Sequence, residues 1–297
     1  MKLTLSIIKA DIGSIGGHVA PSKKLESCVA DSIRKQGANL LLDYSIAHTG
    51  DDIAIVMTHT KGTGNAEVHR LAWDAFRTGA DEARAEGLYG AGLDLLVDSY
   101  SGNVKGMGPA VAEMEIEERP NEPFLVFAAD KTDPGAYNLP LYLAFADPMN
   151  TPGLILSPKM GKGFRFVIMD VNHTEGDRLI ELNAPENLYD IATLLRDPER
   201  FVVESVWSRS NGEQAAAVST TPTSPSPPMP TRRTNWRPCA SASRKPVCCS
   251  LSTAPVVWSP MVIRCSAVGT TFTTARSPCS TCSLNTASAP RWTSWCS

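Results

Sequence analysis

The character of the sequence changes abruptly near residue 219, and this change limits how much of the chain can build a packed domain. Residues 221–297 contain 11 of the 22 prolines and seven of the eight cysteines, but no Asp or Glu. Disordered tails rich in Ser and Pro seldom also carry scattered Cys and Trp with no acidic residue. We therefore interpret residues 220–297 as an irregular tail, either translated out of frame or disordered, and residues 1–219 as one incomplete domain.

The charges divide as unevenly as the prolines. Of the 28 Lys and Arg residues, eight lie in the tail, which leaves 20 in residues 1–220 beside all 31 Asp and Glu residues. The body is therefore acidic, with a net charge near −11 from these 20 basic and 31 acidic residues. Because the basic charges of the tail are dispersed rather than clustered, nucleic acid is not expected as a partner.

The body also lacks the patterns of an exported or membrane-bound protein. The first segment, "MKLTLSIIKADIG", has too short an apolar run for a signal peptide, and no later segment approaches ~20 uncharged apolar residues. Cys28 is the only cysteine in the first 220 residues, which is typical of a protein that keeps its thiols reduced. We expect a cytoplasmic protein with no membrane partner.

Residues 1–219 alternate between strand and helix patterns. Apolar and β-branched runs predict strands over 3–9, 40–48, 52–59, 111–118, 123–130, 164–171 and 200–207. Apolar residues at helical spacing predict helices over 22–37, 65–87 and 185–197, the last beginning at Pro185. In the strand 111–118, Glu113, Glu115 and Glu117 share one face, which predicts that this face contacts water. The mixture indicates a single large α/β domain, a sandwich with helices outside its sheets.

Carboxylates gather where three of these strands end. Asp11 follows the first strand and precedes a glycine-rich loop with His18, Asp51 and Asp52 stand at the head of another strand, and Asp130 with Lys131 ends a third. Adjacent residues of an extended chain point to opposite sides, so Asp51 and Asp52 could address neighbouring ions. Oxygen ligands with one imidazole suit Mg²⁺, whereas zinc would be expected to recruit more His or Cys. Each residue also fits an ordinary role as a turn, a cap or a polar loop residue, and only their conjunction favours a metal site.

A second glycine cluster, "SYSGNVKGMGP", could expose backbone N–H groups to a phosphate. Gly102, Gly106 and Gly108 would supply the loop, and Lys105 or Lys131 the counter-charge. The spacing matches neither a Walker A loop nor a dinucleotide fingerprint. The residues alone thus indicate a Mg²⁺-dependent enzyme that acts on a phosphorylated small molecule.

Four long segments resemble the fructose-1,6-bisphosphate aldolase/phosphatase family of archaea and deeply branching bacteria. They are "IKADIGSIGGHVAPS", "HTGDDIAIVMTHT", "SGNVKGMGPAVAEMEIEERPNEPFLVFAADKTDPGAYNLPLY" and "FADPMNTPGLILSPKMGKGFRF". The resemblance runs over residues 1–219. It implies a four-layer α-β-β-α sandwich, a homo-octamer, and several Mg²⁺ ions in one site. The implied gluconeogenic enzyme condenses dihydroxyacetone phosphate with glyceraldehyde 3-phosphate and then removes the C1 phosphate to leave fructose 6-phosphate.

The resemblance also assigns roles to individual residues. Metal ligands by this match are Asp11, His18, Asp51, Asp52 and Asp130; substrate-binding residues are His18, Tyr89, Gly102, Asn103 and Lys131. Such a lysine and metal ions would offset the charge that develops during phosphoryl transfer.

The chain departs from the family pattern in two places. Leu93 stands where the family has a metal-binding glutamine, and Asp94 beside it is a speculative substitute. The Schiff-base lysine, its two following aspartates and the catalytic tyrosines lie beyond residue 219, so the catalytic residues are unknown here. The tail offers only Lys245, with no aspartate or tyrosine. We expect an impaired enzyme, and the alternative is a non-catalytic metal- or phosphate-binding remnant or an interaction protein with a basic disordered tail.

Overall fold

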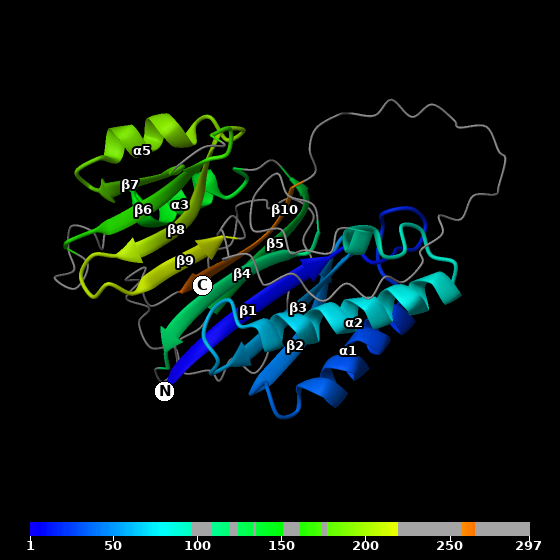
Figure 1. Ribbon diagram of the computed structural model, residues 1–297. Coiled ribbons are helices and arrows are strands. Elements are labelled where there is room, and N and C mark those ends of the chain that lie inside the picture. Colours follow the sequence, from blue (N-terminus) through cyan, green and yellow to red (C-terminus); the bar gives the residue numbers. More distant parts are fainter. Residues whose placement is uncertain are drawn as a thin grey trace, which may run out of the picture.

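The computed structural model describes the main chain of residues 1–96, 108–118, 124–132, 135–150, 161–173, 177–218 and 257–264. Side chains are described over the same ranges except 124, 130–132 and 257–264. Within these residues the chain forms two antiparallel sheets, with helices on the outer face of each (Figure 1).

The first sheet contains four strands in the order β2-β3-β1-β4. Their bounds are Lys2–Ala10 for β1, Asp43–Thr49 for β2, Asp52–His59 for β3 and Ala110–Glu117 for β4. The central strand β1 pairs with β3 and β4, so that Ile7 lies opposite both Val56 and Ala112. Two helices cover this sheet, α1 (Lys23–Gly37) and α2 (Ala66–Ala85). Each begins at a capping side chain, Ser22 or Asn65, that accepts hydrogen bonds from the first turn.

The second sheet contains six strands in the order β5-β10-β9-β8-β6-β7. Their bounds are Phe124–Thr132 for β5, Phe164–Asp170 for β6, Leu179–Ala184 for β7, Phe201–Ser208 for β8, Gln214–Val218 for β9 and Val257–Arg264 for β10. Helices α3 (Asn138–Phe145) and α5 (Leu188–Leu195) pack on its outer face. Asn138 ties this layer together, since its buried amide bonds to Leu195, Phe201 and Val203 of the main chain.

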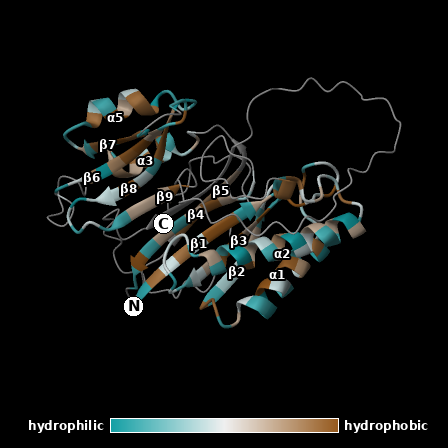
Figure 2. Ribbon diagram, viewed as in Figure 1, coloured by the Kyte–Doolittle hydropathy of each residue, from teal (hydrophilic) through white to brown (hydrophobic). Residues whose placement is uncertain are grey.

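Three hydrophobic clusters fill the three interfaces between four layers. One joins α1 and α2 to the first sheet, another joins α3 and α5 to the second, and a third lies between the sheets. On β1 the alternation is clear, because Ile8 and Ala10 belong to the helix-side cluster and Leu5 and Ile7 to the inter-sheet cluster. Apolar residues accordingly concentrate on the inner strands in Figure 2. The predicted α/β fold, a four-layer α-β-β-α sandwich, is confirmed.

Several predicted details differ from the structure. Helix α5 begins at Leu188 rather than at Pro185, which follows a cis peptide bond. Glu113 does not contact water: its side chain is buried between β1 and α2, where Ser6 of β1 and His69 of α2 bond to it. The segment after residue 219, expected to be irregular, contributes one strand, β10, whose sequence "VWSPMVIR" is apolar and β-branched enough to pair.

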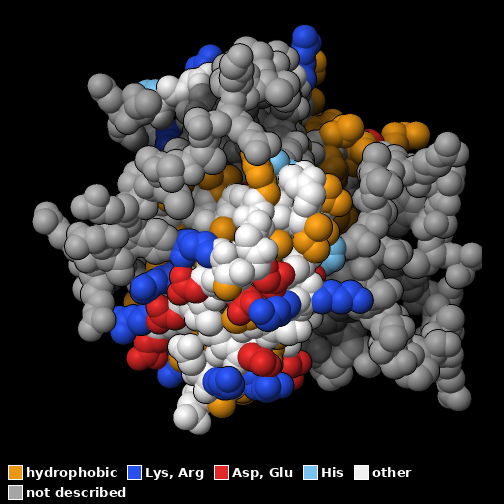
Figure 3. Space-filling view, turned by 90° about the vertical axis from the view of Figure 1, so that its right-hand side faces the viewer, with side chains coloured by type: hydrophobic (Ala, Val, Ile, Leu, Met, Phe, Trp, Pro, Cys, Tyr) orange, Lys and Arg blue, Asp and Glu red, His pale blue; other side chains and the backbone are white. Residues whose placement is uncertain are grey.

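The described part of the face in Figure 3 carries charges of both signs. Figure 3 shows Lys and Arg side chains interspersed with Asp and Glu over the face it presents, as is typical of a solvated surface. Exposed hydrophobic side chains include Ile15, Val19, Tyr89 and Leu96. None of the helices in the described part of the chain is both long and apolar enough to span a membrane.

Candidate metal centre

Asp11, His18 and Asp51 meet at the end of the first sheet. One candidate ligand atom from each lies within 4.8 Å of the other two. His18 Nδ1 is 2.7 Å from Asp51 Oδ2 and 3.8 Å from Asp11 Oδ2. Both aspartates are buried, whereas His18 is about one-third exposed, so the cluster is open to solvent on the histidine side. Two buried carboxylates and an imidazole thus form a compact candidate cation site.

The β2–β3 hairpin places the two adjacent aspartates on different sides. Gly50 takes a left-handed conformation, with φ of 59°, in a tight turn whose flanking residues Thr49 and Asp52 pair. Asp51 then reaches His18, whereas Asp52, the first residue of β3, reaches Lys9 of β1. The alternation expected from the sequence therefore separates the two carboxylates, and Asp52 lies outside the three-residue cluster.

The loop that carries His18 is held against the segment around Tyr89. Ser14 and Tyr89 exchange backbone hydrogen bonds of 2.9 and 3.0 Å, and Ser14 Oγ accepts from the His18 N–H at 2.8 Å. The rings of His18 and Tyr89 meet edge to face, with centroids 4.7 Å apart. His18 itself has a φ of 58°, an uncommon conformation for a residue with a side chain. Tyr89, assigned to substrate by resemblance, thus also fixes a candidate metal ligand.

Gly13 lets this loop approach α2 closely. Its φ is 142°, and a Cβ atom at this position would lie 2.7 Å from Ala83 Cβ. A glycine in such a loop lets the backbone approach either a bound group or another element of the fold. At Gly13, the close neighbour is a helix of the same domain.

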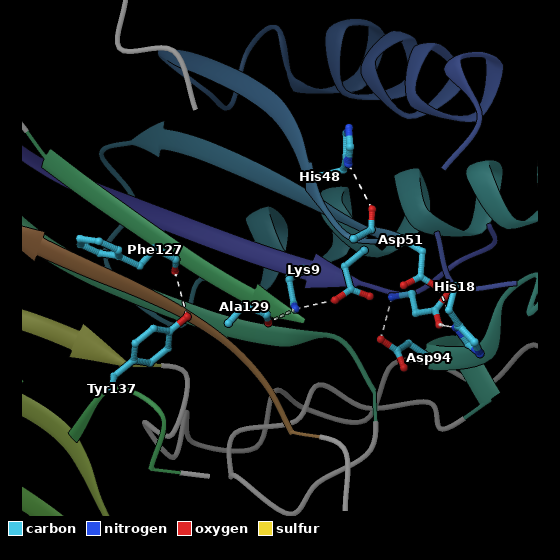
Figure 4. A network of polar contacts seen from close by, with 11 residues as sticks. Lys9, His18, His48, Asp51, Asp94, Phe127, Ala129 and Tyr137 are labelled. Atoms are coloured by element: carbon cyan, nitrogen blue, oxygen red, sulfur yellow. Dashed lines mark hydrogen bonds and ion pairs between the residues drawn. The ribbon is translucent and has the colours of Figure 1, made fainter. Parts of the chain in front are cut away.

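Asp94 holds the main chain of Asp11, one of the three residues of the cluster. Its Oδ2 accepts the Asp11 N–H at 2.8 Å, and its own N–H donates to the Asp11 carbonyl at 3.1 Å (Figure 4). Asp94 lies in the short 3₁₀ helix η1 (Leu93–Leu96), next to the partly exposed Leu93. The structure therefore gives Asp94 a positioning contact with the main chain of a candidate ligand.

Lys9 is a residue of this site that the sequence analysis did not single out. Its Nζ lies 2.5 Å from Asp52 Oδ2 and 2.7 Å from the carbonyl oxygen of Ala129 in β5 (Figure 4). Both side chains of this ion pair are fully buried. A lysine between Ile8 and Ala10 in a predicted strand, two residues before Asp11, was the available sequence signal.

The other candidate site residues lie partly or wholly outside the described part of the chain. Gly102 and Asn103, with Lys105 and Gly106, lie outside the described residues. Asp130 and Lys131 lie near the end of the strand β5, and only their main chain is described. Because the carbonyl of Ala129 bonds to Lys9, the main chain directly before Asp130 is close to Asp52.

The residues present fit Mg²⁺ by their chemistry. The cluster offers carboxylate oxygens and one imidazole, a hard donor set that leaves coordination positions for water and substrate phosphate. A carboxylate only accepts hydrogen bonds, so His18 Nδ1 carries the proton that faces Asp51. A cation could bind that nitrogen only after the proton has left it, for example by transfer to Nε2, because a ligating nitrogen carries no proton.

The fold and the site together define a class: a four-layer α/β protein with a carboxylate-rich cation site at its strand ends. A sequence profile described as fructose-1,6-bisphosphatase matches residues 2–224. The chain belongs to this fructose-1,6-bisphosphatase family, which confirms the resemblance seen in the sequence.

Relatives that carry the name fructose-1,6-bisphosphate aldolase/phosphatase are similar over the same extent. The protein of Thermus thermophilus is 63% identical over 221 residues, which are 74% of this chain and 61% of the relative. The protein of Ignicoccus hospitalis is 51% identical over 221 residues, 73% of this chain and 56% of the relative. The protein of Moorella thermoacetica is 51% identical over 223 residues, which are 74% of this chain and 56% of the relative. The chain thus spans only about three-fifths of the length of such relatives.

Proposed function

We propose that this chain carries the cation- and phosphate-binding part of a Mg²⁺-dependent fructose-1,6-bisphosphate aldolase/phosphatase of gluconeogenesis. The observation that supports this most is the cluster of Asp11, His18 and Asp51, whose ligand atoms lie within 4.8 Å of one another. The substrates would be the two triose phosphates and fructose 1,6-bisphosphate, as the names of the relatives and the resemblance imply.

Asp11, His18 and Asp51 would hold one ion, with Asp52 and Asp130 as ligands of neighbouring ions. Bound Mg²⁺ supplies charge stabilisation at phosphate oxygens. The protein's own part is to keep these side chains in place: Asp94 fixes the main chain of Asp11, and Tyr89 restrains His18. Tyr89, Gly102, Asn103 and Lys131 would contact substrate, and the Lys131 ammonium would offset phosphate charge.

We propose that the reaction is impaired in this chain. An imine-forming aldolase needs a lysine amine and a positioned acid or base such as tyrosine. The tail after residue 219 offers Lys245 but no tyrosine and no aspartate. Leu93, with no polar atom in its side chain, further removes one expected metal ligand.

The test uses the purified 297-residue chain. Calorimetric titration is expected to show saturable Mg²⁺ binding that Asp51→Asn weakens by about tenfold or more, because a ligand charge is lost. Asp190→Asn, which changes an exposed aspartate on α5, is the matched control and should bind as the wild-type chain does. Fructose 1,6-bisphosphate should release little phosphate, and the trioses should not condense. Absence of Mg²⁺ binding would contradict the proposed site, and condensation of the trioses would contradict the proposed impairment.

A second candidate is a remnant that binds metal or phosphate without turnover. It is favoured by the absence of tyrosine and aspartate from residues 221–297. Sequencing the coding DNA across codons 210–230 separates the candidates. A lysine followed by two aspartates in another frame would mark the tail as an artefact and the intact protein as the bifunctional enzyme. We further propose cytoplasmic placement and homo-oligomeric assembly, which the family resemblance implies.

A further inference from the structure

Lys9 lies near the end of β1, an inner strand of the first sheet, but its side chain contacts both sheets. It belongs to β1, where Ala54 of β3 and Ala110 of β4 lie opposite it. On this strand Leu5 and Ile7 face the inter-sheet cluster, and Lys9 follows them at the same alternation. Its side chain therefore points toward the second sheet, where it donates to the carbonyl oxygen of Ala129 (Figure 4).

This lysine would be costly in a core without its partners. Its side chain is 0% exposed, and an unpaired buried ammonium is strongly unfavourable. The Asp52 carboxylate at 2.5 Å and the Ala129 carbonyl at 2.7 Å satisfy two of its three donors. Conversely, Lys9 neutralises one carboxylate of a region where Asp11, Asp51 and Asp52 are all buried.

The same contacts join the two parts of the proposed site. Asp52 stands next to Asp51 of the cation cluster, and Ala129 directly precedes Asp130 and Lys131. A single side chain thus sets both the direction of the Asp52 carboxylate and the position of the end of β5 relative to β3.

We propose that Lys9 is the resident counter-ion of this site, a positioning residue that neutralises Asp52 and anchors the end of β5 in the absence of a divalent cation. The inference rests on the proposed cation site. Lys9 and a bound cation then stabilise the same carboxylates in alternative ways. Without Lys9, the fold depends more strongly on the cation.

Thermal unfolding and Mg²⁺ titration of the full chain test this role. Lys9→Met keeps the length and apolar stem but removes the charge, and it is expected to lower the unfolding midpoint in the absence of metal. Saturating Mg²⁺ should then raise its midpoint by more than it raises that of the wild-type chain, with Mg²⁺ binding about tenfold tighter because one positive charge is gone. A purely structural role would lower the midpoint equally with and without Mg²⁺.

Two further variants keep the test decisive. Lys9→Met combined with Asp52→Asn removes both charges, and it should recover much of the metal-free stability even if the single variant does not fold. Arg200→Met breaks the pair between Arg200 and the buried Asp170 in the second sheet, and it should lose stability without changing the Mg²⁺-induced shift.

The outcomes separate the two proposals. If the wild-type chain shows no Mg²⁺ binding, the proposed cation site fails and the role of Lys9 falls with it. If the wild-type chain binds Mg²⁺ but Lys9→Met binds it equally or more weakly, only the counter-ion role of Lys9 is overturned. Failure of the double variant to regain stability overturns it as well.

Discussion

Asp94 determines where Asp11 can place its carboxylate, although Asp94 itself lies outside the three-residue cluster. Two hydrogen bonds join its carboxylate and N–H to the Asp11 main chain, at 2.8 and 3.1 Å. The variant Asp94→Ala removes the first of these hydrogen bonds, so that the buried N–H of Asp11 loses the carboxylate that accepts from it. We expect Mg²⁺ affinity to fall by about tenfold or more, the usual cost of losing a group that orients a ligand.

The conservative variant Asp94→Asn decides what kind of residue Asp94 is. Its amide oxygen can still accept the Asp11 N–H, so a positioning residue should keep near-wild-type Mg²⁺ affinity in calorimetric titration. A metal ligand would lose affinity in both variants, because the negative charge is lost in both. Equal loss in Asp94→Asn and Asp94→Ala would therefore contradict the positioning role.

The sequence predicted individual residues best where a strand ends in a turn. Metal ligands were proposed at Asp11, His18, Asp51, Asp52 and Asp130. The structure brings candidate ligand atoms of the first three within 4.8 Å of one another. Lys9 could not be found this way, because its role depends on Asp52 and Ala129, which are 43 and 120 residues away in sequence. The alternation along a strand predicts which face of the sheet a side chain lies on, but not which polar group it contacts on that face.

At the scale of elements, a buried polar cluster links β1, β3 and β4 to α2. Ser6 Oγ donates to Glu113 Oε1 at 2.6 Å, and His69 Nε2 lies 2.9 Å from the same oxygen. His59 Nδ1 accepts the Lys61 N–H at 3.2 Å, so neutral His59 carries its proton on Nε2 and donates to Ser6 at 2.8 Å. Glu113 contacts this cluster instead of the water that the sequence predicted. The reason is that α2, which carries His69, covers this face of β4.

This environment favours neutral His59 and ionised Glu113. Burial lowers the pKa of His59 below 6.5, and the nearby Glu113 charge only partly opposes this. Burial alone would raise the pKa of Glu113, but hydrogen bonds from His69, Ser6 and the Gly64 N–H outweigh it and lower the pKa below 4.5. In both cases the folded protein binds its proton less readily than the unfolded chain does.

The free energy of unfolding is therefore expected to fall as the pH drops. The contribution of His59 is complete above pH 6.5, the ordinary pKa of histidine, and is lost as the pH falls from there toward its lowered folded pKa. Denaturant unfolding at several pH values between 7.5 and 5 should show this slope, and His59→Gln should flatten it. Exposed His173 supplies the control, because His173→Gln should keep the wild-type slope. An unchanged slope in His59→Gln would show that another group causes the pH dependence.

At the scale of the whole molecule, the alternation of patterns predicted a sandwich with helices outside its sheets, and the family resemblance supplied the four-layer order. The main strands of the first sheet and helices α1 and α2 have strong periodicity, and they were predicted within a few residues. β9, with the sequence "QAAAV", and the short helix α3 have no such signal of their own. Their conformation depends on the sheet and helices around them, which local patterns do not contain.

The placement of β10 leads to a prediction about the tail. Among the described strands, β5 hydrogen-bonds to β10 alone, and β10 in turn bonds to β9 through Met261, Val262 and Ile263. A chain ending at residue 250 would lack this strand and leave the facing edges of β5 and β9 without their partner. Unpaired edges exchange their amide hydrogens faster and invite aggregation.

Hydrogen exchange measured by mass spectrometry, on the full chain and on the chain ending at residue 250, tests this arrangement. Peptides over β5 should exchange about tenfold faster or more in the shorter chain, the rate change that corresponds to about 1.4 kcal/mol of local stability. Peptides over β1 and β3 should keep their protection, because their ladder does not involve the tail. Equal exchange of β5 in the two chains would mean that the inter-sheet core and the Lys9 bond to Ala129 hold β5 without help from the tail. Faster exchange would instead make the end of β5, with Asp130 and Lys131, dependent on whichever strand lies between β5 and β9.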